Sequence, residues 1–158
     1  MNIYKRLNVQ RLIKTITPAI RESLRMSTRS SISVKNMEGT ITTVYCHFDG
    51  YPSRVGKILL ENYSEYHDAL ALVSLGGISS LNESIECPEG HSYDNQIDGY
   101  TVFYHRDRGE ELRISYHDTI EDAWDESGQE YNYYHDTEKW HLQKSVPIPL
   151  EEILNEVD

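Results

Sequence analysis

The stretch "YCHFDGYPSRVGKILLENY", residues 45–63, brings side chains that could do chemistry close together. Its first residues include a thiol at Cys46, an imidazole at His47 and a carboxylate at Asp49. Neighbouring side chains of a strand point to opposite faces, so Tyr45, His47 and Asp49 share one face, opposite to the thiol. We therefore interpret Cys46 as a small buried residue and not as a nucleophile activated by His47.

Four residues could nominally ligate one zinc ion: Cys46, His47, Cys87 and His91. The segment "CPEGH", residues 87–91, resembles one half of a zinc knuckle. However, Cys46 and His47 are adjacent and on opposite faces of a strand, whereas paired zinc ligands are normally separated by two or more residues. The sequence therefore predicts no bound zinc, and it indicates no other metal or cofactor.

Histidine–carboxylate pairs recur in the triplet Tyr-His-Asp, at residues 66–68, 116–118 and 134–136. Such pairs can support acid–base catalysis or metal chemistry. Here one triplet falls at the start of a predicted helix and the others at strand ends, where these residues are common. The chain has no HExxH, GxSxG, P-loop or GxGxxG motif. No catalytic residue is assigned, and the sequence favours a protein that is not an enzyme.

Basic residues reappear after the acidic middle of the chain in "HRDRGEE", residues 105–111. Arg106 and Arg108 could clamp a phosphate or carboxylate, because a guanidinium offers a planar fork of donors. They would share one side if a strand continues that far. The alternative is that both pair with Asp107, Glu110 or other acids of the same chain. The candidate residues for binding a ligand or partner are Tyr45, His47, Asp49, Tyr51, Arg106 and Arg108.

The first half of the chain predicts a hairpin followed by two helices. Alternating residues indicate strands at 31–35 and 40–48, joined by a turn. "DGYPS" is typical of a turn, with Ser53 as the N-cap of a helix over 54–63. A second helix, over 65–75, ends at a pair of glycines. Residues 82–99 are polar and rich in turn formers, and they read as a long loop.

The second half predicts two more hairpins and two short helices. "YTVFYHR" and "ELRISYH" read as strands joined by "DRGE", and "EYNYYHD" pairs with "KWHLQK". "DTIEDAWDES" reads as a helix capped by Asp118 or Thr119, and "LEEILNEV" as a terminal helix. The fold class expected is α+β, with an antiparallel sheet built from hairpins and short helices on one face.

Charge divides the 158 residues into two parts. Residues 1–25 hold six basic residues and one acid, about +5, and apolar residues recur there at helical spacing. Residues 26–158 hold nine basic and twenty-five acidic residues, about −16, and we expect them to form a single acidic domain. The basic, amphipathic extension could be a membrane-surface helix, a transit peptide or a docking helix, or could lie on the acidic body.

The acidic body favours basic partners and repels nucleic acid and anionic membranes. No apolar run of the sequence is long enough to span a bilayer. Two cysteines are too few for a disulfide framework, so a cytoplasmic location is expected. A homo-oligomer is also possible, because the apolar stripe of residues 1–25 could be buried on a second copy.

Several segments together resemble a family of small, generally uncharacterised proteins of bacteriophages and prophages. They are "MSTRSSISV", "YCHFDGYPSRVGKILLENY", "LGGISSL", "FYHRDRGE" and "YNYYHDTEKW". The resemblance spans residues 26–142, and it carries over no catalytic residue. It implies an accessory protein that binds a host factor, including components of antiphage defence.

Three functions therefore remain open. The protein could bind and inhibit a host protein through its acidic, Tyr-rich surface. Alternatively, a small-molecule pocket built from Tyr45, His47, Tyr51 and Arg106 or Arg108 could sequester or hydrolyse a nucleotide signal. A weaker alternative is a component of phage structure or assembly.

Overall fold

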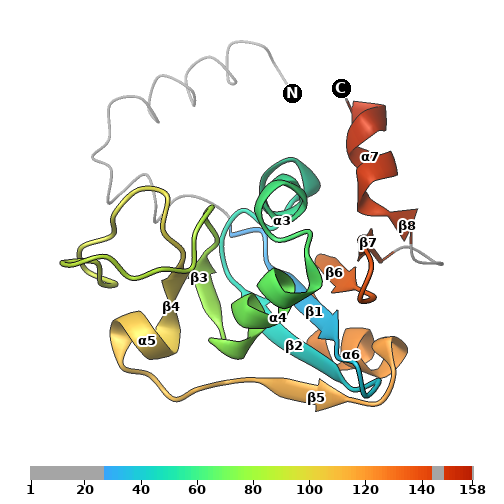
Figure 1. The fold of residues 1–158 in the computed structure, drawn as a ribbon, viewed down its shortest axis with the longest axis horizontal. Helices are drawn as coiled ribbons and strands as arrows, with labels where there is room; N and C mark the ends of the chain where they lie inside the picture. Colours follow the sequence, from blue (N-terminus) through green and yellow to red (C-terminus); the bar gives the residue numbers. More distant parts are fainter. Residues whose placement is uncertain (1–26, 144–147, 158) are drawn as a thin grey trace, which may run out of the picture.

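The computed structural model describes residues 27–143 and 148–157, and these form one mixed sheet with short helices (Figure 1). The strand order is β4-β3-β2-β1-β6-β7-β8, and β5 pairs with β2 beside this path. The strands are β1 (Ser30–Lys35), β2 (Ile41–Cys46), β3 (Ile78–Ser80), β4 (Val102–Phe103), β5 (Ser115–His117), β6 (Tyr131–His135), β7 (Trp140–Leu142) and β8 (Ile148–Pro149). The predicted α+β class is confirmed.

The central hairpin of β1 and β2 is confirmed as predicted. The two strands are antiparallel, with Ile32 opposite Val44. Their turn is held by Asn36, whose side-chain oxygen accepts the backbone N–H groups of Glu38 and Thr40 at 3.0 and 2.9 Å. An Asn that bonds its own backbone two residues on is a standard way to close such a turn. The hairpin of β6 and β7 is also confirmed as an antiparallel pair.

Two strand pairs are parallel, so the sheet is not purely antiparallel as the hairpins suggested. β6 runs parallel to β1, and β3 runs parallel to β2. Parallel neighbours need a crossover connection, which helices supply here. The helices η1 (Pro52–Gly56, a π-helical turn), α3 (Lys57–Asn62) and α4 (Tyr66–Ser74) connect β2 to β3.

Residues 100–117 differ most from the prediction. Only Val102–Phe103 form strand β4, and the next residues form a helix, α5 (Tyr104–Arg108). The Asp107 carboxylate starts this helix by accepting the backbone N–H of Phe103 at 2.7 Å, and Gly109 ends it at φ 77°. The predicted hairpin is therefore wrong, because β4 pairs with β3 and β5 pairs with β2. In Figure 1 the chain runs from α5 along the lower edge of the molecule to β5.

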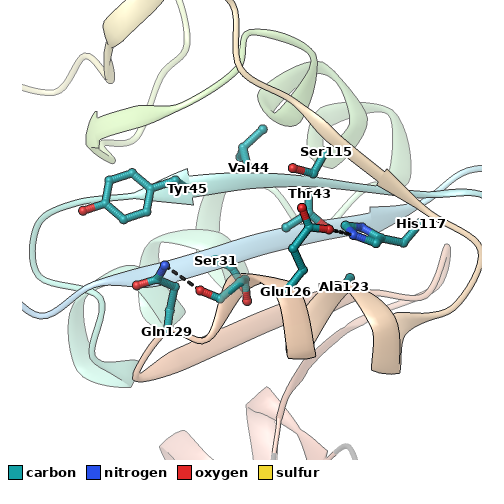
Figure 2. Close-up of a pocket in the computed structure, with 10 residues that line it drawn as sticks. Ser31, Thr43, Val44, Tyr45, Ser115, His117, Ala123, Glu126 and Gln129 are labelled. Atoms are coloured by element: carbon teal, nitrogen blue, oxygen red, sulfur yellow. Dashed lines mark hydrogen bonds and ion pairs between the residues drawn. The ribbon is translucent and has the colours of Figure 1, made fainter.

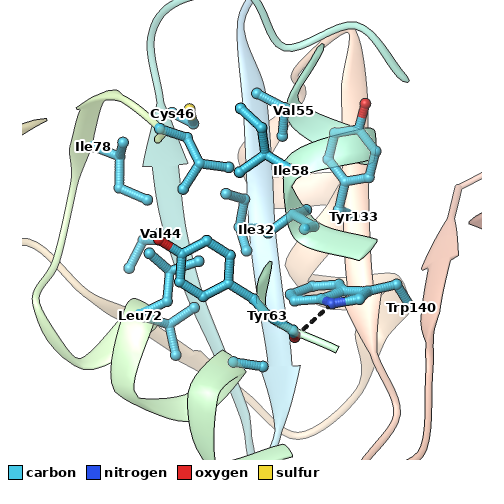
Figure 3. Packing of buried hydrophobic residues seen from close by; sticks show 14 of the residues in the cluster. Ile32, Val44, Cys46, Val55, Ile58, Tyr63, Leu72, Ile78, Tyr133 and Trp140 are labelled. Carbon is cyan, nitrogen blue, oxygen red and sulfur yellow. Dashed lines mark hydrogen bonds between the residues drawn. The ribbon is translucent and has the colours of Figure 1, made fainter. Parts of the chain in front are cut away.

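The main core lies between one sheet face and the helices η1, α3, α4 and α7 (Leu150–Val157). Trp140 and Tyr133 are the largest fully buried side chains of the described residues. The Trp140 indole N–H donates to the backbone oxygen of Tyr63 at 2.8 Å, which joins β7 to the end of α3 (Figure 3). Ile32, Val44 and Leu72 belong to the same buried cluster.

The opposite face of the sheet is covered by α6 (Ile120–Ser127), so the helices do not all lie on one face as predicted. Ile120, Ala123 and Trp124 of this helix pack on Ile41 of β2 and on the ring of Tyr134. The predicted cap is confirmed, because the Thr119 hydroxyl accepts the backbone N–H of Asp122 at 3.2 Å. The helix covers only part of this face.

Removing the hydroxyl of Tyr133 should destabilise the fold by about 1–2 kcal/mol. This hydroxyl is buried and donates to the backbone oxygen of Gly50 at 2.7 Å. Tyr133→Phe would leave that carbonyl without its partner. Urea unfolding of Tyr133→Phe beside Tyr116→Phe, whose ring is 65% exposed, measures the difference. Equal stability of the two variants would show that the buried hydrogen bond contributes nothing.

The predicted helical extension over residues 1–25 lies outside the described residues, and the boundary at residue 26 stays a prediction. None of the helices within 27–143 and 148–157 combines the length and the apolar character needed to cross a bilayer.

Candidate functional site

A pocket of about 340 Å³ opens near the end of β2. Here the segment before β5 is no longer paired with β2, and β3 takes its place beside β2. We call it the arginine–tyrosine pocket. It is lined by Arg29, Tyr45, Gly77, Tyr104, Glu110, Glu111 and Arg113.

The strand register explains why Tyr45 and Arg113 meet at this pocket. Ile41 lies opposite His117 and Thr43 opposite Ser115 in the antiparallel pair of β2 and β5. The pairing ends there, and Tyr45 and Arg113 each lie two residues beyond the last pair, at the next positions of the same alternation. Directly opposite residues of an antiparallel pair point to the same face of the sheet. Both side chains therefore reach the face that α6 leaves partly open.

Tyr45 and His47 are brought together as their alternation predicted. The Tyr45 hydroxyl lies 2.6 Å from Nδ1 of His47, and the His47 ring packs edge-on against Phe48. Burial lowers the pKa of His47, and the charge of Arg29 lowers it further. Burial raises the pKa of Tyr45, although Arg29 opposes this shift. Both groups are therefore neutral near pH 7, and the positive charge at the pocket comes from arginine.

Arg29 and Arg113 differ from the other arginines that the structure describes. Arg54 donates to the side-chain oxygen of Asn82 at 3.0 Å, and Arg106 and Arg108 have acidic partners. Within residues 27–143 and 148–157, neither Arg29 nor Arg113 makes an ion pair or a side-chain hydrogen bond. Both are exposed and line the same pocket. Two unpaired guanidinium groups around one pocket are equipped to bind an anion.

Arg106 does not belong to the binding site that the sequence suggested. Its guanidinium donates to the Asp107 carboxylate at 2.9 and 3.1 Å, to the backbone oxygen of Thr101 at 3.1 Å and to that of Ile85. Arg106 therefore ties the long loop to α5, because these bonds use most of its donors. The pairing with Asp107 considered from the sequence is confirmed.

Arg108 is also used within the chain and does not share a face with Arg106 along a strand. Its guanidinium lies 3.8 Å from the Glu110 carboxylate and packs over the Tyr93 ring, 4.4 Å from the centroid. Both arginines lie on α5, where residues two apart do not face the same way. The clamp predicted from Arg106 and Arg108 is therefore wrong.

Asp49 and Tyr51 form the turn after β2 and do not line the arginine–tyrosine pocket. Asp49 has φ 54°, whereas Gly50 does not have a positive φ. Gly50 is required for space, since a Cβ there would lie 2.8 Å from both Ser30 Cβ and the Thr28 oxygen. Tyr51 precedes the helical turn as its N-cap, in place of Ser53, which lies inside it.

Cys46 is a core residue, as its strand position predicted. It is 0% exposed, and burial raises the pKa of its thiol to about 12, against a smaller opposing effect of a hydrogen bond with Ser30. A thiol that stays protonated is a poor nucleophile.

Iodoacetamide should therefore alkylate one of the two cysteines in the folded protein at pH 8. Cys87 is exposed and should react, whereas Cys46 should react only after unfolding in guanidinium. Intact-mass spectrometry before and after denaturation counts the adducts. Two adducts on the folded protein would contradict the burial of Cys46.

Two of the other nominal zinc ligands, Cys87 and His91, lie in the loop of residues 82–99. His91 is buried, and its Nδ1 accepts the backbone N–H of Ile97 at 3.1 Å. Its Nε2 therefore carries the proton and lies 3.2 Å from the Thr101 oxygen. Within the described part of the chain, no group of three or more His, Cys, Asp or Glu side chains is arranged to hold a metal ion.

A second pocket, of about 200 Å³, lies beside the first and shares Tyr45 with it. We call it the hydroxyl pocket. Figure 2 shows Tyr45 at one end and His117 with Glu126 at the other. Its polar lining comes from Ser31, Thr43, Tyr45, Ser115, His117, Glu126, Ser127 and Gln129.

Of the residues that line this pocket, Tyr45 was a candidate from the sequence, whereas Arg29, Tyr104 and Arg113 were not; His47 contacts Tyr45 without lining the pocket. The only local signal for Arg113 was its place in a run predicted as a strand. In comparisons with protein-family models, with curated proteins and with solved structures, nothing matches this chain.

Proposed function

We propose that this protein binds a nucleotide in the arginine–tyrosine pocket and sequesters it. The observation that carries the proposal is a pair of arginines, Arg29 and Arg113, that line one pocket of a strongly acidic protein and have no ion-pair partner within the described residues. In a chain with 26 acids and 15 basic residues, guanidinium groups find carboxylate partners easily. Two that remain unpaired side by side favour an external anion over a role in folding.

The other residues of the pocket match the remaining parts of a nucleotide. Tyr45 and Tyr104 present aromatic rings on which a base can stack, an interaction of about 1–3 kcal/mol per base in other proteins. Glu111 has no ion-pair partner within the described residues, and a carboxylate accepts hydrogen bonds from amino groups of a base. Glu110 is already paired with Arg108 at 3.8 Å. Gly77 leaves room beside Tyr104, because a Cβ there would only touch that ring at 3.5 Å.

The biological setting proposed is that of a phage accessory protein in the cytoplasm of the host cell. The resemblance of residues 26–142 to phage and prophage proteins supports this setting. A protein of this kind would withhold a nucleotide signal from a host defence system. Stoichiometric binding without turnover is proposed, since the Cys46 thiol is buried in the core and the arginines alone supply no attacking group.

Thermal melting with small probes tests the proposal. AMP should raise the melting temperature, because a ligand that binds only the folded state stabilises it. Adenosine lacks the phosphate and inorganic phosphate lacks the base, so each alone should raise it less. If adenosine stabilised the protein as much as AMP does, the arginines would not contribute to binding through the phosphate. No stabilisation by AMP, GMP, CMP or UMP at millimolar concentration would contradict the proposal.

A second candidate function, inhibition of a basic host protein, rests on the surface around α6. Six acids and no basic residue lie between residues 118 and 130, and the Tyr116 ring beside them is 65% exposed. Acidic surfaces steer basic partners, and tyrosines often anchor interfaces.

Neutralising the acidic side chains of α6 distinguishes this candidate from nucleotide binding, because none of them lines the arginine–tyrosine pocket. Glu121→Gln, Asp122→Asn and Asp125→Asn together would neutralise the exposed face of α6. The matched control neutralises three exposed acids of the long loop, Glu83, Glu86 and Glu89. A host protein retained by the control and lost by the α6 variant would support the interface. Equal retention by both variants, or none by the wild type, would contradict it.

A further inference from the structure

The two pockets lie on the same face of the sheet and share one wall. Tyr45 lines both of them. The extended segment before and within β5 contributes Glu111 and Arg113 to the arginine–tyrosine pocket, and Ser115 and His117 to the hydroxyl pocket. These are alternate residues, as expected when one extended segment turns a single face towards a groove.

The floor of the groove shows the same alternation. Arg29 directly precedes β1 and Ser31 lies in it, and Thr43 and Tyr45 belong to β2. The wall from residue 111 to residue 117 is about 20 Å long at roughly 3.3 Å per residue. That length exceeds the reach of one nucleotide and suits two linked nucleosides.

The two ends of the groove differ in charge. Arg29 and Arg113 stand at one end, together with Glu110 and Glu111, whereas no Lys or Arg of the described residues lines the hydroxyl pocket. There the Nε2 atom of His117 and the Oε2 atom of Glu126 are hydrogen bonded. A second phosphate there would face the Glu126 carboxylate without a compensating cation. The hydroxyl end is therefore suited to an uncharged group that bears hydroxyls.

Unused polar groups at the hydroxyl end point to the same ligand chemistry. The Ser115 side chain makes no hydrogen bond within the described residues. Because His117 Nε2 is bonded to a carboxylate, it carries the proton, and Nδ1 is left as a buried acceptor without a partner in that part of the chain. Ser31 and Ser127 instead already contact Asn132, at 2.6 and 2.8 Å. A free hydroxyl and an imidazole nitrogen are suitable partners for ribose.

We propose that the two pockets are subsites of one groove for a dinucleoside monophosphate. The phosphate and one nucleoside occupy the arginine–tyrosine pocket, and the second, uncharged nucleoside passes Tyr45 into the hydroxyl pocket. This inference rests on the proposed nucleotide-binding function and specifies the ligand class of the same site.

Equilibrium titration of the full-length protein with AMP and with adenylyl-3′,5′-adenosine tests the inference. The dinucleoside should bind the wild type at least tenfold more tightly than AMP. Ser115→Trp fills the hydroxyl pocket from an exposed position of β5. It should reduce the affinity for the dinucleoside to that for AMP and leave AMP binding unchanged. The control Tyr116→Trp changes the next residue of the strand, which points to the other face, and should preserve the tenfold difference.

The outcomes separate this inference from the function on which it rests. If AMP binds and the dinucleoside binds no more tightly, the second subsite is wrong while the proposed function stands. If Ser115→Trp leaves the tenfold advantage intact, the second nucleoside does not occupy the hydroxyl pocket. If neither ligand binds the folded wild type, the proposed function and the inference both fail.

Discussion

Replacing Arg29 and Arg113 together by Ala should weaken AMP binding by about 100-fold or more. A hydrogen bond to a charged group contributes roughly 1.5–3 kcal/mol, so the loss of two such contacts exceeds the 2.8 kcal/mol that corresponds to 100-fold. Both side chains are exposed and unpaired within the described residues, so their removal should leave the fold intact. Isothermal titration calorimetry of the double variant measures the affinity, and thermal melting without ligand confirms that it folds.

The matched control for this prediction is Arg108→Ala. Arg108 has the same charge and is 51% exposed, but it is paired with Glu110 and packs on Tyr93. Its removal should change AMP affinity by less than a factor of about three, because Arg108 is not among the residues that line the pocket and an exposed ion pair contributes little. A similar loss in the control and in the double variant would show that the effect reflects net charge and not the pocket.

Adding a side chain at Gly50 should destabilise the protein by about 1–3 kcal/mol. Its Cβ would lie 2.8 Å from the Thr28 backbone oxygen and from Ser30 Cβ, and Ser30 is fully buried. A backbone atom cannot move aside as the end of a flexible side chain can. Gly50→Ala measures this steric cost, and Gly50→Val should be at least as destabilising. Urea unfolding gives the free energy of unfolding.

Gly77→Ala is the control for the steric explanation. Its Cβ would meet only Tyr104 Cδ2, at 3.5 Å, and its φ is not positive. It should therefore change stability by no more than about 0.5 kcal/mol. Equal stability of Gly50→Ala and Gly77→Ala would contradict the claim that the turn at Gly50 packs too tightly on Thr28 and Ser30 to accept a Cβ.

Local patterns predicted the elements that depend on neighbouring residues. The β1–β2 hairpin, the helices after Tyr51, the Thr119 cap and the β6–β7 hairpin could all be derived from turn residues and periodicity. Each is stabilised by contacts over a short stretch of sequence. The parallel pairing of β6 with β1 could not be derived, because it depends on which sheet edge remains free after distant segments have packed.

Residues 100–117 show why the candidate site was only partly predicted. Their alternating pattern is typical of a hairpin, but the Asp107 carboxylate and its bonds to Phe103 and Arg106 favour a helical turn. That turn places Arg106 in a structural role, and the chain pairs with β2 only from Ser115 on, two residues after Arg113. Tyr45 could be identified from its own strand, whereas the place of Arg113 in the same pocket depends on the pairing of β5 with β2.

The most direct test of the account is an NMR titration of the protein with AMP, with the Nε–Hε signals of the arginine side chains as the readout. The signals of Arg29 and Arg113 should shift in a saturable way, and those of Arg106 and Arg108 should stay in place. That result would locate a phosphate between the two arginines that lack partners in the described structure. Shifts confined to other arginines, or the absence of any saturable shift, would contradict nucleotide binding at the arginine–tyrosine pocket.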